Sequence, residues 1–202
     1  MIKLMNLRNK IIEKFIKFDK FIVFFVEPLN FIPFDSSRVR GQISIDMITR
    51  ENSVDIIKYF PEKRVDVFRE KLKRGEIGIY VRHKGNVVGY MWRKDYDTRK
   101  RVKADGYIPL SGTFCHINFA RVTEHMKGRG LQLLMLTWLI NDAFSKGIPR
   151  IYTDMEHTNL VSMRNVVKIG FVECFRLFVV RVVINNELYN FSIKYRNKNS
   201  SY

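Results

Sequence analysis

The sequence contains little of what disulfide-stapled, repetitive or membrane-spanning proteins depend on. It has two cysteines, Cys115 and Cys174, whose spacing forms neither a disulfide framework nor a zinc motif. It has no internal repeat, no low-complexity segment and no apolar run long enough to cross a bilayer. We therefore expect a globular protein of the reducing cytoplasm that holds no metal.

Acidic residues are scarce relative to basic ones. The chain carries 36 Lys and Arg against 20 Asp and Glu, a formal net charge of +16. Residues 61–105 alone hold fourteen basic and seven acidic side chains. Such an excess favours an anionic partner: a phosphorylated cofactor, an acidic carrier protein, nucleic acid or a membrane surface. Nucleic acid is the weakest of these candidates, because no motif of interleaved basic and aromatic residues accompanies the charge.

The distribution of apolar residues predicts one α/β domain with a mixed sheet. Strands are expected at 42–48, 77–82, 87–92, 113–120, 151–155, 171–183 and 187–195, and helices at 53–59, 65–72, 130–144 and 160–168. The charged residues 93–105 are expected to form a loop inserted between two strands. Residues 196–202 are expected to be a C-terminal tail.

The N-terminal residues follow a separate pattern. Apolar side chains recur there at steps of three and four, with lysines between them: Leu4, Leu7, Ile11, Phe15, Phe18 and Ile22. This spacing predicts an amphipathic helix with a basic face. Charged residues interrupt it and no cleavage site follows, which argues against a signal peptide. We expect residues 1–40 to form an accessory helix and loop, docked on the protein's own core rather than on a membrane surface.

The most informative segment runs from Glu124 to Leu134, between a predicted strand and an apolar helix. Gly128 and Gly130 allow the backbone to bring N–H groups close to a bound group. The following helix adds N–H donors and the positive end of its dipole, which suit a phosphate. The segment therefore predicts a phosphate cradle, and the alternative is a glycine-rich turn that only starts a helix.

His125-Met-Lys-Gly-Arg-Gly130 resembles the acetyl-CoA loop of the Gcn5-related N-acetyltransferase (GNAT) superfamily. Downstream, Asn159-Leu-Val-Ser162 and Lys168-Ile-Gly-Phe171 resemble a second family motif, closest to the branch that acetylates ribosomal-protein N-termini. The resemblance implies a mostly antiparallel, twisted sheet flanked by helices within residues 41–195. It also implies an enzyme that transfers acetyl from acetyl-CoA, or an acyl group from another acyl-CoA, directly to a primary amine of a small molecule or peptide.

The same resemblance implies which residues bind the cofactor. The loop backbone would hold the pyrophosphate, the strand before it would pair with the pantetheine, and an asparagine would contact the cofactor nearby. These residues are Phe119, Ala120, Arg121, His125, Met126, Lys127, Gly128, Arg129, Gly130, Leu131 and Asn159. The chain departs from the family at His125, where Arg or Gln is usual. It also has Val166 where many relatives carry a tyrosine that reprotonates the leaving thiolate.

Acyl transfer to an amine requires a base or a water chain, because only the neutral amine attacks. Side chains alternate along the strand at 113–120, so His116 and Asn118 share one face. His116 is the first candidate base, because relatives often place the base on this face and histidine accepts a proton near neutral pH. A structural histidine is the alternative. Glu156, which shares a strand face with Asp154, is the second candidate base.

Two other functions stay open. An acidic acyl carrier protein would suit the basic residues 61–105 as the acyl donor. Alternatively, the chain would bind coenzyme A without catalysis, since Val166 cannot act as the acid. A monomer and a homodimer are both compatible with the sequence, and no motif identifies the amine acceptor.

Overall fold

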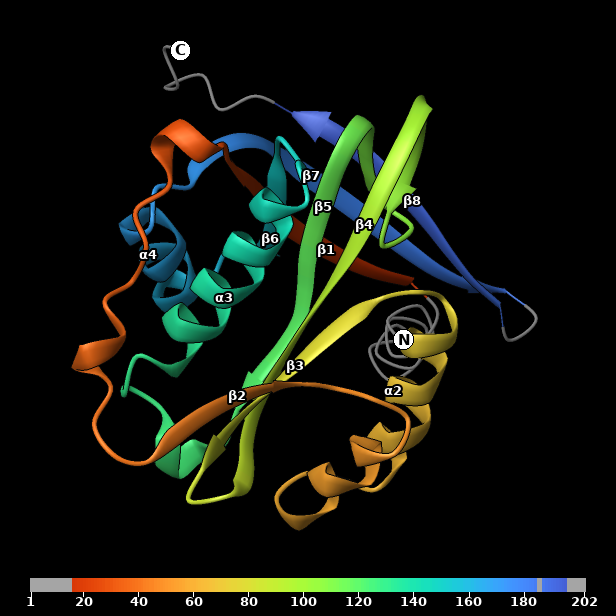
Figure 1. Cartoon of the computed structure of the whole chain (residues 1–202). Coiled ribbons are helices and arrows are strands. Elements are labelled where there is room, and N and C mark those ends of the chain that lie inside the picture. Colours follow the sequence, from red (N-terminus) through yellow and green to blue (C-terminus); the bar gives the residue numbers. More distant parts are fainter. Residues whose placement is uncertain (1–15, 185–186, 196–202) are drawn as a thin grey trace, which may run out of the picture.

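The computed structural model describes residues 16–184 and 187–195. In this part of the chain, eight strands form one sheet in the order β2-β3-β4-β5-β6-β1-β7-β8 (Figure 1). Every neighbouring pair is antiparallel except β5 and β6, which run parallel. The mixed, mostly antiparallel α/β fold expected from the sequence is confirmed.

The helices cover both faces of the sheet, with α2 on one side and α3 and α4 on the other (Figure 1). The strands are β1 Ile16–Val26, β2 Ile43–Met47, β3 Ile77–His83, β4 Asn86–Ala104, β5 Ile108–Val122, β6 Ile151–Glu156, β7 Val172–Ile184 and β8 Glu187–Tyr195. The α-helices are α2 Lys63–Lys73, α3 Leu131–Ser145 and α4 Leu160–Lys168. The helix expected at 53–59 is a 3-10 helix over Asn52–Lys58. No helix in the described ranges is long and apolar enough to cross a membrane.

Residues 16–26 are not helical, so the helix predicted to run to Ile22 is wrong from residue 16 onward. They form β1, an interior strand that pairs with β6 on one side and β7 on the other. Phe18 and Ile22 are four residues apart, and four is an even number, so this spacing places both side chains on one face of a strand as well as of a helix. The accessory role expected for this segment is therefore wrong too. The remainder of the predicted helix, residues 1–15, lies outside the described residues, as does the tail at 196–202.

The loop predicted at 93–105 is wrong as well. β4 continues to Ala104 and returns through a turn at Asp105 and Gly106 into β5, which forms a long hairpin arm. Its charged residues alternate with Tyr96 and Val102, which pack into a cluster beneath β1 and β7. When only part of one face of a strand is buried, most of its residues are polar or charged, so the alternating apolar pattern that predicts a strand is weak.

The main core lies between the sheet and helices α3 and α4, and it positions the start of α3 beside β5. Arg93 of β4 is fully buried and contributes to this placement. Its guanidinium donates to the carbonyl oxygen of Leu139 at 2.7 Å and pairs with the Asp142 carboxylate of α3 at 2.7 Å. Arg93 also pairs with Asp95 of its own strand, at 3.1 Å. Shifting the helix would break the bonds to Leu139 and Asp142, and replacing lost partners of a buried cation is costly, so these contacts fix the helix against the sheet.

Candidate active site

The parallel strands β5 and β6 separate in the middle of the sheet. They pair only from Cys115 opposite Ile151 to Ile117 opposite Thr153. Beyond this point β5 stays paired with β4, and its other edge has no strand partner in the described ranges. A β-bulge follows, in which Phe119, with φ +47°, and Ala120 lie opposite a single residue of β4. The separation leaves polar backbone groups of β5 facing an opening.

Two adjoining grooves occupy this opening. The larger has a volume of about 600 Å³ and lies between the end of β5, the start of α3 and one face of α4. The smaller, of about 290 Å³, lies where β5 and β6 diverge. Ala120, Gln132, Asn159 and Ser162 line both grooves. Together they form a path from the glycine loop to the middle of the sheet.

The glycine loop leads directly into α3 at the wide end of this path. Gly128 and Gly130 have φ values of +75° and +77°, which glycine adopts without strain. The first backbone bond of the helix runs from Leu134 N to Gly130 O at 3.0 Å, so the N–H groups just before Leu134 have no intrahelical acceptor. A Cβ added at Gly128 would meet no atom within 4 Å. Open space beside unpaired N–H donors at a helix N-terminus fits a phosphate-bearing ligand.

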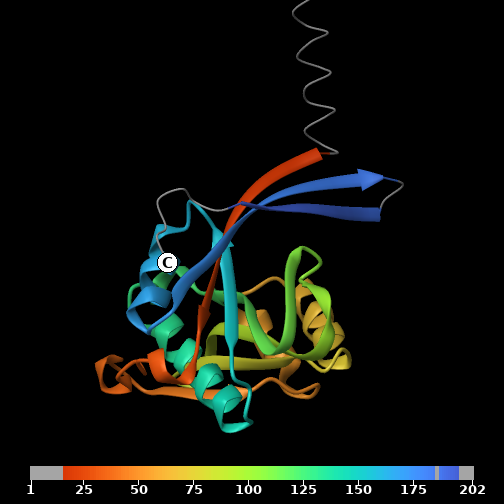
Figure 2. The same ribbon diagram turned by 90° about the horizontal axis from the view of Figure 1, so that it is seen from above.

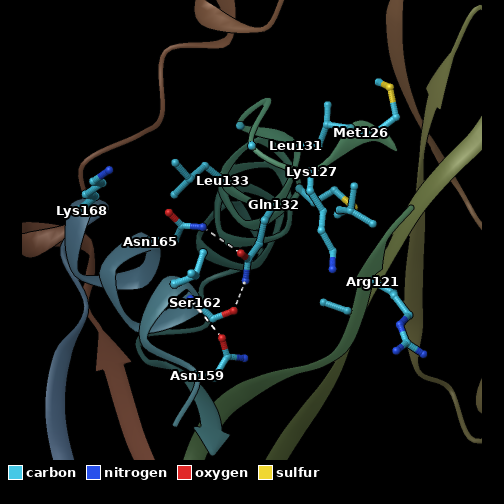
Figure 3. Close-up of a pocket in the computed structure, with 16 residues that line it drawn as sticks. Arg121, Met126, Lys127, Leu131, Gln132, Leu133, Asn159, Ser162, Asn165 and Lys168 are labelled. Carbon is cyan, nitrogen blue, oxygen red and sulfur yellow. Dashed lines mark hydrogen bonds between the residues drawn. The ribbon is translucent and has the colours of Figure 1, made fainter. Parts of the chain in front are cut away.

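Among the groove residues to which the sequence assigned no binding role, Gln132, Ser162 and Asn165 are linked by hydrogen bonds. Gln132 Nε2 donates to Ser162 Oγ at 3.2 Å, and Asn165 Nδ2 donates to Gln132 Oε1 at 2.9 Å (Figure 3). The side chain of Asn159 caps α4 by accepting a hydrogen bond from Ser162 N at 3.2 Å. The spacing of three between Asn159, Ser162 and Asn165 was the available signal, because it places all three on one helix face.

The predicted cofactor-binding residues are mostly brought together. Those that line the larger groove are Ala120, Arg121, Met126, Lys127, Gly128, Gly130, Leu131 and Asn159. Phe119 lines the smaller groove. Arg129 lies in a neighbouring hollow with Arg38 and Arg40. His125 instead packs its ring on Tyr59, with 5.4 Å between the ring centroids.

His116 is fully buried and lines neither groove. Its Nε2 lies 2.9 Å from Asp154 Oδ1, and its Nδ1 lies 3.5 Å from Asp105 Oδ2. Burial lowers the pKa of the imidazole, but the hydrogen bond to Asp154 and the charges of Asp154 and Asp105 outweigh it, so the pKa is raised above its ordinary value. The arrangement favours an imidazolium held between two carboxylates.

Asp105, His116 and Asp154 offer ligand atoms within 4.8 Å of one another, which raises the question of a metal site. The two carboxylates approach opposite nitrogens of the imidazole ring, whereas a metal ion would bind only one ring nitrogen. Both carboxylates also accept other hydrogen bonds: Tyr107 Oη donates to Asp154 Oδ2 at 2.6 Å, and Asn118 Nδ2 donates to Asp105. This network suits a shared proton better than a metal ion.

The raised pKa of His116 predicts a pH-dependent stability. The paired imidazolium stabilises the folded state fully below the ordinary histidine value of 6.5, and this contribution is lost as pH rises through the raised folded-state pKa. Unfolding by urea between pH 5 and pH 9 should show the wild-type advantage over His116→Gln shrinking as pH increases. The exposed His157→Gln variant is the control and should track the wild type. A constant advantage at every pH would contradict the ion-paired state.

The other candidate residues lie at different depths. Asp154 and Glu156 both line the smaller groove, with Asp154 largely buried and Glu156 exposed. Val166 is buried and lines the same groove. Cys115 is buried on the opposite face of β5, and burial raises the pKa of its thiol. Cys115 therefore packs as an apolar residue.

Known proteins share this architecture. Residues 45–171 match the family model described as the acetyltransferase (GNAT) family. An acetyltransferase of the GNAT family from Colwellia psychrerythraea superposes with a TM-score of 0.58 at 13% identity, over 93% of this chain and 62% of that one. A putative acetyltransferase of the GNAT family from Novosphingobium aromaticivorans gives a TM-score of 0.56 at 10% identity, over 81% and 63%. The aminoglycoside acetyltransferase AAC(6')-Iy, bound to a bisubstrate analogue, gives 0.53 at 14% identity, over 66% and 92%.

The chain spans 58%, 66% and 62% of the length of the first three solved structures that it matches. Among curated proteins, none is significantly similar in sequence. The family model covers well over half of the chain and includes both the glycine loop and the whole second motif, which ends at Phe171. The protein therefore belongs to the acetyltransferase (GNAT) family.

Proposed function

We propose that this protein is an N-acetyltransferase that binds acetyl-CoA in the larger groove and acetylates a primary amine in the smaller one. The observation that carries the proposal is the glycine loop at the N-terminus of α3, which opens onto the path between the diverging strands β5 and β6. A phosphate at the loop and an extended chain along the open edge of β5 would place a thioester near Asn118 and Asp154.

Both backbone N–H groups and a charged side chain would bind the cofactor. The N–H groups of the loop and of the first turn of α3 would hold the pyrophosphate, and Lys127 would add charge from the rim. Lys127 already pairs with Glu124 at 2.7 Å, which reduces its contribution. Asn159 keeps its amide nitrogen available beside both grooves while its oxygen caps α4. Bound acetyl-CoA would supply the thioester carbonyl that the amine attacks.

We propose Asp154, rather than His116, as the group that takes the proton from the amine. Asp154 lines the smaller groove, whereas His116 lies behind it and both of its ring nitrogens face carboxylates. His116 and Tyr107 fix the Asp154 carboxylate by hydrogen bonds at 2.9 and 2.6 Å. The neutral amine bonds to the acetyl carbon and gives up one proton to Asp154, and the bond from that carbon to sulfur breaks with its electron pair left on the thiolate, which takes a proton from water. Val166 offers no proton to the departing thiolate.

The acceptor is proposed only by chemical class. AAC(6')-Iy, whose bisubstrate analogue joins CoA to acetylneamine, supports an amino sugar. The resemblance of Asn159 and Ser162 to the ribosomal-protein branch supports a peptide N-terminus instead. Thiol release from acetyl-CoA, measured against a panel of amino sugars, polyamines and N-terminal peptides, tests both. An acyl carrier protein offered as donor in the same assay tests the alternative donor.

Replacing Gly128 by valine should weaken the affinity for coenzyme A at least about tenfold, which corresponds to ~1.4 kcal/mol. The added side chain would enter the open space beside the N–H donors, and a β-branched residue is strained at φ +75°. Isothermal titration calorimetry measures the affinity directly.

Gly85→Val is the matched control, because Gly85 has φ +78° and also meets no atom within 4 Å but lies in the turn between β3 and β4. It should carry similar strain and leave coenzyme A affinity intact. Equal losses in the two variants would show that strain, not the cradle, is responsible. Absence of coenzyme A binding by the wild type would remove the proposed function, and binding without turnover of any amine would favour a non-catalytic module.

A further inference from the structure

A continuous apolar surface lies on three neighbouring strands, well away from the grooves. Residues that lie directly opposite each other on β1, β7 and β8 point to the same side of the sheet, so their side chains are neighbours. We name this surface the outer sheet face; it consists of Ile16, Phe18, Phe178, Val180, Val182, Tyr189, Phe191 and Ile193. The face therefore interrupts the usual alternation, in which the solvent side of a strand is polar.

Several of these side chains are exposed. The exposed fractions are 61% for Phe18, 57% for Phe191 and 64% for Ile193. Phe18 and Phe178 stack with their ring centroids 5.9 Å apart, so the residues form one patch rather than scattered sites. Figure 2 shows the outer halves of β1, β7 and β8 extending past α4, beyond the body of the molecule. Contiguous apolar patches on a protein surface usually mark an interaction site.

The border of the outer sheet face is mostly basic, although Glu187 accepts a hydrogen bond from Tyr189 Oη at one end of it. Lys20 lies within its rows, opposite Phe178. An adjoining apolar groove of about 610 Å³, between α4 and the strands, is lined by Arg164, Lys168 and Arg176 together with one carboxylate, Glu173. Arg164 and Lys168 form no ion pair within the described ranges. Cationic side chains beside exposed aromatic and aliphatic groups match an anionic lipid bilayer, in which phosphate groups lie above the hydrocarbon chains.

The sequence next to this face carries the same charge. Residues 1–15, which join the face at Ile16, contain four basic residues and one acidic residue. Residues 196–202, which follow β8, contain two basic and no acidic residues. The net charge of +16 opposes the approach of a second copy and attracts an anionic surface. Both segments that continue in sequence from β1 and β8 thus carry net positive charge.

We propose that the outer sheet face docks on an anionic lipid bilayer, with Phe18, Phe191 and Ile193 entering the headgroup region and the basic border contacting lipid phosphates. This mode is peripheral, and the residues of the outer sheet face line neither groove of the acetyltransferase site. Lys168 of the basic border lies between the two regions, because it also lines the larger groove.

Co-sedimentation of the full chain with vesicles tests the proposal. Vesicles of phosphatidylcholine with 30% phosphatidylglycerol should bind the protein, pure phosphatidylcholine vesicles should bind it far more weakly, and added NaCl should release it. The double variant Phe191→Ser with Ile193→Ser should lose at least about tenfold in vesicle affinity. Leu29→Ser is the matched control, because Leu29 is 99% exposed in a different part of the molecule, and it should bind as the wild type does.

Thermal unfolding and coenzyme A titration of the double variant establish that it is folded. Unchanged vesicle affinity in the folded double variant would overturn the proposal, as would equal binding to neutral and anionic vesicles. Light scattering that shows a wild-type dimer, dissociated by the same two substitutions, would also overturn it by assigning the face to a second copy of the chain.

Discussion

Gly170→Ala should destabilise the protein by about 3 kcal/mol or more, the largest stability effect that we expect from a single added methyl group. Gly170 follows α4 with φ +94°, and a Cβ built there would lie 1.8 Å from the carbonyl oxygen of Asn30. That atom belongs to the backbone, and Ile32 N donates to Ile169 O at 3.1 Å, so the segment is fixed where it crosses the helix end. The overlap cannot be relieved by turning a side chain.

Gly147→Ala separates this contact from backbone strain. Gly147 follows α3 with φ +77°, and a Cβ there would meet no atom within 4 Å. It should cost only about 1–2 kcal/mol, the value typical of a left-handed residue that is not glycine. Urea unfolding of both variants gives the comparison. Equal losses would show that the packing of residues 30–32 against α4 contributes nothing.

Gly170 also shows how far sequence reasoning extends. A glycine after a helix predicts a C-cap, and the structure has it at that position. The contact that makes the glycine indispensable joins residues about 140 positions apart in sequence, and no local pattern reports it. The helices and strands from 130 to 171 were predicted within a few residues, because period and end signals there are local.

The two failures of the fold prediction have the same origin. Both segments are strands because of the strands that they pair with. β1 pairs with β7, which is distant in sequence, and the arm of β4 pairs with the first part of β5, which carries no clear strand pattern of its own. Spacing of three and four in the first case, and dense charge in the second, suggested other structures. Propensity is a weak guide where pairing across a sheet determines the conformation.

The candidate site divides in the same way. The glycine loop could be predicted, because its glycines and the helix after it are contiguous in sequence. The bonds of Gln132 to Ser162 and Asn165 join two helices, and the burial of His116 depends on Asp105 and Asp154 from other elements. Alternation along a strand indicated which face His116 occupies, but it could not indicate that Asp154 stands between His116 and the groove.

Asp154→Asn should lower the turnover number about 100-fold or more, because a positioned base contributes on the order of 10² to 10⁴ to such transfers. Asparagine keeps the shape of the side chain and accepts the hydrogen bond from Tyr107, but it cannot take a proton. Coenzyme A affinity should change little, since the phosphate cradle is distant from Asp154. Steady-state kinetics of thiol release, together with calorimetry, measure the two effects separately.

Two further variants distinguish a base from its support. Glu156→Gln should lower turnover by less than about fivefold, because Glu156 is exposed and the structure gives its carboxylate no hydrogen-bond partner in the described ranges. His116→Gln retains an amide to orient Asp154 but removes the imidazolium, and it should shift the pH profile of turnover more than its maximum. A larger loss in Glu156→Gln than in Asp154→Asn would transfer the role of base to Glu156. We expect the larger loss in Asp154→Asn because the two carboxylates differ in burial. Asp154 is held by two hydrogen bonds at the edge of the groove and so takes a proton in a fixed direction, whereas the exposed Glu156 is not held in this way.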